Sequence, residues 1–121
     1  MNFSKGRYFE NKASDYLIKA GHNLLARNFY TPFGEIDLIS EFRNKIYFTE
    51  VKFLTTKNKL HPIQKIDQSK IRKIYLSISY LKKFCKIRNL QVDSLCLYYK
   101  KAYSTSAAEL VFEHYQDLRL G

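Results

Sequence analysis

The spacing of apolar residues switches from a helical pattern to a strand pattern and back, and this alternation constrains the fold more than any other feature. Over residues 4–20, apolar side chains recur every three or four positions, which predicts an amphipathic helix that ends at Gly21. Residues 23–53 contain short β-rich segments separated by turn residues. A second helical pattern follows and covers residues 63–86 or 67–86.

Three strands are expected between the two helices, and two more after the second helix. In the middle one of the three, Ile36 and Leu38 alternate with Asp37 and Ile39, so we expect the two pairs on opposite faces. The resulting order α-β-β-β-α-β-β predicts an α/β fold with a mixed sheet flanked by helices, built as one domain over residues 1–121. The expected strands cover residues 23–30, 35–40, 46–53, 90–99 and 110–115.

Positive charge is concentrated in the middle of the chain. The 121 residues carry a formal net charge of +10, and residues 52–101 contain 13 basic but only 2 acidic side chains. Such a segment focuses a positive potential and favours nucleic acid as the partner. The alternatives at this level are a solvated face that keeps the protein soluble and a face that binds an anionic membrane surface. A third interpretation is a module whose basic segment docks onto an acidic protein.

Other features bear on the environment of the protein. No apolar run approaches the roughly 20 residues that span a bilayer, and residues 1–6 lack the apolar core of a secretory signal. The two cysteines, Cys85 and Cys96, form neither a disulfide framework nor a metal-binding spacing. We therefore expect a reduced, cytoplasmic protein with no membrane partner.

Two short acidic segments contain the candidate chemistry. Glu50 and Lys52 are two residues apart on one expected strand, so both side chains emerge on the same face. Asp37 lies on the preceding strand, where directly opposite side chains have Cβ atoms about 5 Å apart. We predict that Asp37 and Glu50 bind one Mg²⁺ or Mn²⁺ ion and that Lys52 orients a water or stabilises charge on a scissile phosphate. The alternative is a plain ion pair between Lys52 and the acids. Glu35 is expected to be either a solvated acid of the strand or a group that supports the metal ligands without binding the ion.

Five motifs spread over residues 6–93 are similar to a known family, the YraN family (UPF0102). That family is similar to the Holliday junction resolvases of the PD-(D/E)xK restriction-endonuclease-like superfamily, whose core order is αβββαβ. The motifs are Gly6-x-x-x-Glu10-x-x-Ala13, Arg27-Asn28, Gly34-Glu35-Ile36-Asp37-Leu38-Ile39, Phe48-x-Glu50-Val51-Lys52 and Val92-Asp93.

The resemblance implies a role for several residues. It implies Asp37 and Glu50 as metal ligands, Lys52 as the catalytic lysine and Glu10 as a further acid that faces the site. Lys70 matches a lysine at the start of the second helix. The activity that the resemblance implies is metal-dependent hydrolysis of nucleic acid, with DNA expected over RNA, at branched structures or recombination intermediates and by a homodimer. The alternative is a nucleic-acid-binding protein that keeps the nuclease fold without catalysis. The residues expected to contact the nucleic-acid backbone are Lys57, Lys59, Lys70, Arg72 and Lys73.

The chain departs from the family pattern at three places. Phe9 stands where the family often has a second glycine before the glutamate. Phe53 follows Glu-Val-Lys where the family usually has an arginine, which removes a phosphate contact. Gln91-Val92-Asp93 replaces the common Arg-Phe-Asp. None of these departures changes Asp37, Glu50 or Lys52.

Overall fold

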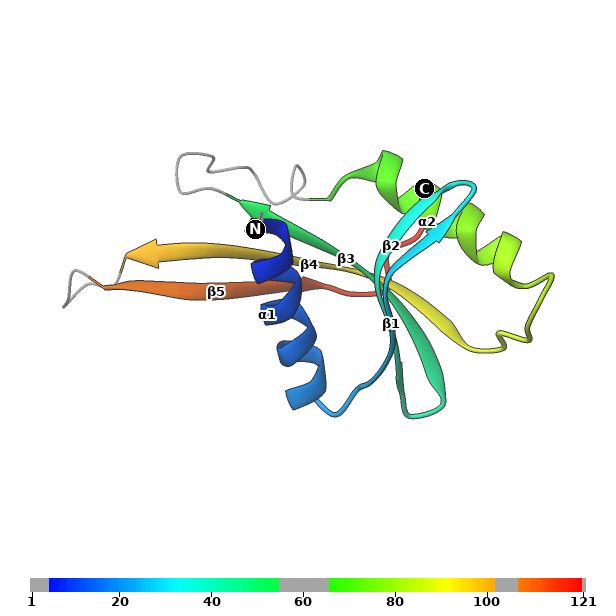
Figure 1. Ribbon diagram of the computed structural model, residues 1–121, viewed down its shortest axis with the longest axis horizontal. Coiled ribbons are helices and arrows are strands. Elements are labelled where there is room, and N and C mark those ends of the chain that lie inside the picture. The colour runs from blue at the N-terminus through cyan, green and yellow to red at the C-terminus, as the bar shows by residue number, and fades with distance from the viewer. Residues whose placement is uncertain (1–4, 55–65, 102–106, 121) are drawn as a thin grey trace.

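A computed structural model describes residues 5–54, 66–101 and 107–120 and has an α/β fold (Figure 1). The expected order of elements and the mixed sheet are confirmed, consistent with a restriction-endonuclease-like core. Position 4 and the earlier of the two expected starts of the second helix lie outside the described residues. The elements are α1 (Lys5–Lys19), β1 (Asn23–Thr31), β2 (Gly34–Phe42), β3 (Lys45–Leu54), α2 (Gln68–Leu81), β4 (Leu90–Lys101) and β5 (Ala108–Tyr115).

The five strands form one sheet in the order β1-β2-β3-β4-β5. Strands β3 and β4 are parallel, whereas the other three neighbouring pairs are antiparallel. A parallel pair needs a long crossover between its strands, and α2 lies within the segment that provides it. No helix in the described parts of the chain is long and apolar enough to cross a membrane.

The two helices pack on two separate apolar clusters of the sheet. Phe9, Ala13 and Leu17 of α1 pack with Leu38 of β2 and with β4. The buried stripe of α2 packs with Ile36 and Ile39 of β2, and with residues of β3 and β4. The sheet therefore separates an α1 layer from an α2 layer. The stripe consists of Ile71, Ile74 and Ile78, as the helical spacing predicted.

The expectation that Ile36 and Leu38 share a face is wrong, because the two side chains lie in different clusters. The pairing of β1 with β2 joins Arg27 to Leu38 and Phe29 to Ile36 but passes over the position between them. There, Asn28 has a left-handed backbone with φ of 49°. Along β2 itself, simple alternation fails between Ile36 and Leu38, where the strand has left its pairing with β3.

Helix α2 begins where the later expectation placed it but ends earlier than predicted. Asp67 is the N-cap, and its Oδ1 accepts hydrogen bonds from the backbone N–H groups of Ser69 (3.0 Å) and Lys70 (3.3 Å). The helix ends at Leu81 because the chain then tightens into a turn, in which the Phe84 N–H donates to the Leu81 carbonyl. The basic residues after Leu81 therefore lie on an irregular segment.

Loss of the cap should weaken the start of α2. Replacing Asp67 with alanine should lower the free energy of unfolding by about 1 kcal/mol, because two N–H groups lose their acceptor. Urea denaturation of the purified protein measures this difference. Asp67→Ser should retain most of the stability, and Gln68→Ala, an exposed position, is the matched control. Equal unfolding midpoints for Asp67→Ala and the control would show that the cap contributes nothing.

Candidate functional site

The site lies where β2 and β3 separate. Their pairing runs from Phe42 opposite Lys45 to Leu38 opposite Thr49. The next two residues in this register, Asp37 and Glu50, are not paired through their backbones. Instead, Asp37 Oδ2 accepts a hydrogen bond of 2.8 Å from the Val51 N–H. Meanwhile β2 continues to pair with β1 as far as Gly34. The two strands therefore open a gap between them at the two predicted metal ligands.

A pocket of about 200 Å³ occupies this region. It brings Asp37 and Glu50 to one cavity, as the strand positions predicted. It also adds two lysines of α2, which sequence reasoning had assigned to the nucleic-acid backbone. The pocket is lined by Gly34, Glu35, Asp37, Glu50, Lys70, Lys73 and Ile74.

Glu50 is the most unusual group in the pocket. Its side chain is only 4% exposed, and neither carboxylate oxygen has a hydrogen-bond partner among the described residues. Lys70 is in ion-pair contact with this carboxylate, and its Nζ lies 3.4 Å from Oε1. Burial raises the pKa of Glu50 to about 7, the charge of Lys70 lowers it and that of Asp37 raises it. A buried carboxylate with orphan oxygens is costly unless a cation compensates it.

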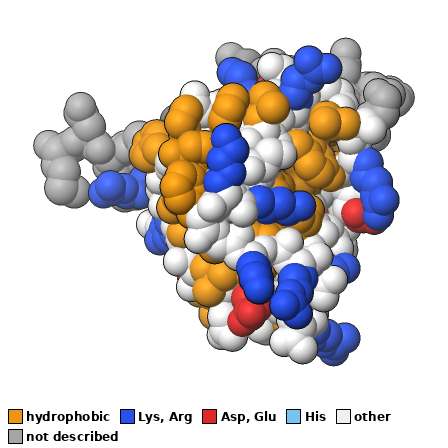
Figure 2. Space-filling model, turned by 90° about the vertical axis from the view of Figure 1, so that its right-hand side faces the viewer, with side chains coloured by type: hydrophobic (Ala, Val, Ile, Leu, Met, Phe, Trp, Pro, Cys, Tyr) orange, Lys and Arg blue, Asp and Glu red, His pale blue; other side chains and the backbone are white. Residues whose placement is uncertain are grey.

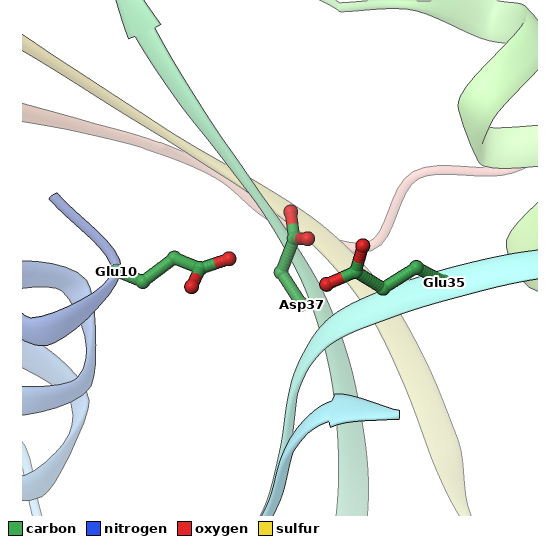
Figure 3. Close-up of side chains that lie close together, drawn as sticks. All are labelled: Glu10, Glu35 and Asp37. Atoms are coloured by element: carbon green, nitrogen blue, oxygen red, sulfur yellow. The ribbon is translucent and has the colours of Figure 1, made fainter. Parts of the chain in front are cut away.

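The pKa of Asp37 is also raised, and Asp37 belongs to a second group of acidic side chains as well. Burial raises its pKa to about 6, with the Val51 N–H opposing and the charges of Glu10 and Glu35 adding to the rise. One carboxylate oxygen from each of Glu10, Glu35 and Asp37 lies within 4.8 Å of the other two. Figure 3 shows the three side chains converging, Glu10 from α1 and the other two from β2. This cluster could hold a metal ion.

Asn28 holds two of these acids together. Its Nδ2 donates to Glu10 Oε1 at 2.7 Å and to Glu35 Oε1 at 2.5 Å. Asparagine is among the few residues that tolerate a left-handed backbone, and this conformation occurs at Asn28. The sequence analysis assigned no role to Asn28 and left Glu35 as either a solvated acid or a group that supports the metal ligands. The available signal was the Arg27-Asn28 motif, but nothing in its spacing indicated which side chains it would contact.

The remaining predicted site residues are distributed unevenly. Lys52 is half-buried on β3, two residues beyond Glu50, and does not line the pocket. Lys70 and Lys73 line the pocket, and Arg72 is exposed on α2. Lys57 and Lys59 lie outside the described residues. The structure therefore assembles Glu10, Asp37, Glu50 and two lysines, while the role of Lys52 stays a prediction.

The departures from the family pattern are explained by internal contacts. Phe9 and Phe53 touch each other, with their rings stacked at 12° and 3.7 Å between centroids. An apolar contact beneath α1 therefore occupies the place of the missing arginine. Gln91 donates to Asp93 Oδ1 at 2.9 Å, and the other Asp93 oxygen lies 2.8 Å from His114 Nε2. Asp93 is fully buried in this network and does not line the pocket.

Comparison with known proteins shows one consistent similarity. The model of the uncharacterised protein family UPF0102 matches residues 9–97, a range that includes every acid of the pocket and the cluster. A UPF0102 protein of Campylobacter fetus subsp. fetus is 37% identical over 89 residues, which cover 73% of this chain and 78% of the relative. A UPF0102 protein of Persephonella marina is 35% identical over 95 residues, which cover 77% of this chain and 82% of the relative. A UPF0102 protein of Fusobacterium nucleatum subsp. nucleatum is 32% identical over 94 residues, which cover 78% of this chain and 79% of the relative.

The raised pKa of Glu50 predicts a pH dependence of stability in the presence of a metal chelator. The folded protein holds a proton on Glu50 up to about pH 7, whereas a glutamate in the unfolded chain releases it near 4.5. The folded state therefore binds more protons in this window, and stability should fall as the pH rises through it. Urea denaturation at a series of pH values should show a weaker fall for Glu50→Gln than for the wild type.

The pH dependence of the wild type has to be compared with that of Glu50→Gln, because His22 changes stability with pH in the opposite direction. Burial lowers the pKa of His22, so its contribution to stability grows as the pH rises. Glu109→Gln, which removes an exposed carboxylate on β5, is the matched control and should follow the wild-type curve. Parallel curves for Glu50→Gln and the wild type would contradict the assignment of a shifted Glu50.

Proposed function

The chain belongs to the uncharacterised protein family UPF0102, and we propose that it is a metal-dependent endonuclease that hydrolyses phosphodiester bonds in DNA. Branched DNA or a recombination intermediate is the proposed substrate. The observation that carries the proposal is Glu50, a buried carboxylate without a hydrogen-bond partner among the described residues, which lines a pocket together with two further carboxylates and two lysines. A structural ion pair would instead be expected to satisfy its acceptors internally.

The donor set fits a hard divalent cation. Asp37 and Glu50 would hold Mg²⁺ or Mn²⁺, with Glu10 and Glu35 as further oxygen donors on the side of α1. Magnesium is usually bound by one or two carboxylates and keeps several waters, which leaves room for a phosphate oxygen. When bound, such an ion supplies Lewis-acid polarisation of the phosphate and lowers the pKa of a coordinated water.

The residues of the chain supply positioning and charge. Lys70 and Lys73 line the pocket and would contact the phosphates on either side of the scissile bond. Lys52, on the same side of β3 as Glu50 by strand alternation, would stabilise the negative charge that develops on the phosphate. Asn28 would fix the orientation of Glu10 and Glu35 through its two hydrogen bonds.

The contact between Lys70 and Glu50 favours a second candidate function. In that alternative, Lys70 neutralises Glu50 in place of a divalent cation, and the protein binds nucleic acid without cleaving it. The two candidates differ in metal binding, which calorimetry can measure without reference to activity.

The wild type should bind Mn²⁺ in isothermal titration calorimetry, and Asp37→Asn and Glu50→Gln should each weaken this binding by more than about tenfold. Loss of a group that only hydrogen-bonds to a metal ligand typically costs about tenfold in affinity, so loss of a ligand should cost more. With Mg²⁺ or Mn²⁺, the wild type should cleave labelled branched DNA, and both variants should lose this cleavage. Lys52→Ala should keep the Mn²⁺ affinity but lose cleavage. Glu109→Gln, with its exposed carboxylate, should match the wild type in both assays.

An equal Mn²⁺ affinity of wild type, Asp37→Asn and Glu50→Gln would reject the metal site. Absence of cleavage together with salt-sensitive DNA binding, unchanged by divalent ions, would instead support the non-catalytic alternative.

A further inference from the structure

An exposed apolar stripe runs along the outer side of α2 and continues past its end. Leu76 and Tyr80 are four residues apart on α2, a spacing that places side chains on one side of a helix, and Phe84 lies in the turn that follows the helix. Leu76 is 43% exposed and Phe84 is 70% exposed, although burial of such large apolar groups is favourable. The stripe faces away from the buried isoleucines that anchor α2 to the sheet.

The turn between β1 and β2 extends this stripe. Phe33, at the tip of the turn, is 41% exposed, and its ring centroid lies 6.3 Å from that of Tyr80. The Tyr80 ring lies 5.2 Å from that of Phe84. A hydrogen bond of 2.6 Å between the hydroxyl groups of Thr31 and Ser77 fastens the turn to α2. Phe33, Tyr80 and Phe84 therefore form one continuous series of rings, termed here the aromatic row.

One end of the aromatic row adjoins the acidic pocket. Phe33 directly precedes Gly34, which lines the pocket together with Lys73. The two are close, since a Cβ on Gly34 would lie 3.7 Å from Lys73 Cδ. An extended ligand bound along the aromatic row would therefore run from Phe84, beside α2, to the carboxylates of the pocket.

The surroundings of the row are basic. From residue 68 to residue 90 the sequence contains seven lysines and arginines and no acidic residue. On the face where α2 ends, hydrophobic side chains alternate with many Lys and Arg side chains and few acidic ones (Figure 2). A second copy of this chain, with its own charge of +10, would bring like charges together here. A polyanion would neutralise them.

We propose that the aromatic row binds unpaired bases of single-stranded nucleic acid by stacking. Aromatic rings accept any base on their faces, and basic side chains beside them track the phosphates. The bases of an intact duplex are stacked on each other and cannot reach exposed rings. Binding of unpaired bases does not depend on the proposed nuclease function. Only one consequence rests on it, namely that the unpaired segment of the substrate lies next to the cleaved bond.

The test measures binding without catalysis. Fluorescence anisotropy in a chelating buffer compares a labelled mixed-sequence oligonucleotide of about 15 nucleotides, single-stranded or annealed to its complement. The wild type should bind the single strand more tightly. Phe84→Ala and Tyr80→Ala should weaken single-strand binding about fivefold or more, while duplex binding changes little, because stacking on one ring typically contributes at least that factor. Phe84→Trp should keep the affinity.

The matched control is Ile18→Ala, which removes an apolar side chain that is 50% exposed on α1. It should bind both nucleic acids as the wild type does. Because Phe84 is largely exposed, its replacement should leave thermal unfolding unchanged, which circular dichroism verifies. The salt dependence of binding should also be the same in Phe84→Ala, since no charge is removed.

Three results would overturn the inference. One is unchanged single-strand binding by Phe84→Ala, and another is an equal loss for single strand and duplex. The third is a wild type that sediments as a dimer and a Phe84→Ala variant that sediments as a monomer but keeps its affinity for the single strand. The aromatic row would then be a contact between two copies of the chain. Single-strand binding that depends on the row, in a protein that cleaves nothing, would uphold the inference and reject the nuclease.

Discussion

The separation of β2 from β3 at Asp37 and Glu50 is the constraint on which the candidate site depends. A regular antiparallel pair would bury both strands' backbones against each other and leave no cavity. Here the Asp37 side chain takes the Val51 N–H, and a pocket opens that Glu50, with its two orphan oxygens, helps to line. The raised pKa values of Asp37 and Glu50 follow from burial in the same place. The features expected of a cation site thus have one geometric origin.

The surrounding scaffold keeps this opening in shape from both layers. On the α1 side, Asn28 holds Glu10 and Glu35, and the stacked rings of Phe9 and Phe53 pack the helix against β3. On the α2 side, the Asp67 cap begins the helix that presents Lys70 and Lys73. The acids therefore face a basic helix across a small gap, an arrangement suited to a phosphate accompanied by a cation.

Much of this could be predicted from local pattern. Helical and alternating spacing indicated the order of elements, and the strand positions of Asp37 and Glu50 indicated that they would meet. The predicted face of Leu38 was wrong because alternation presumes a regularly paired strand, and β2 leaves its pairing with β3 beyond Leu38. The end of α2 was missed because the stretch to residue 86 contains no proline or glycine, whereas the structure forms a turn after Leu81.

The sequence by itself determined the α/β order, the concentration of positive charge, and the presence of two acids and a lysine on adjacent strands. These depend on periodicity and on residues near one another along the chain. Only the tertiary structure decided that Glu35 joins Glu10 and Asp37, that Lys70 touches Glu50, and that Phe33 meets Tyr80. Such contacts join segments from different layers, and their partners depend on how the helices and the β1–β2 turn pack on the sheet, which no local pattern encodes.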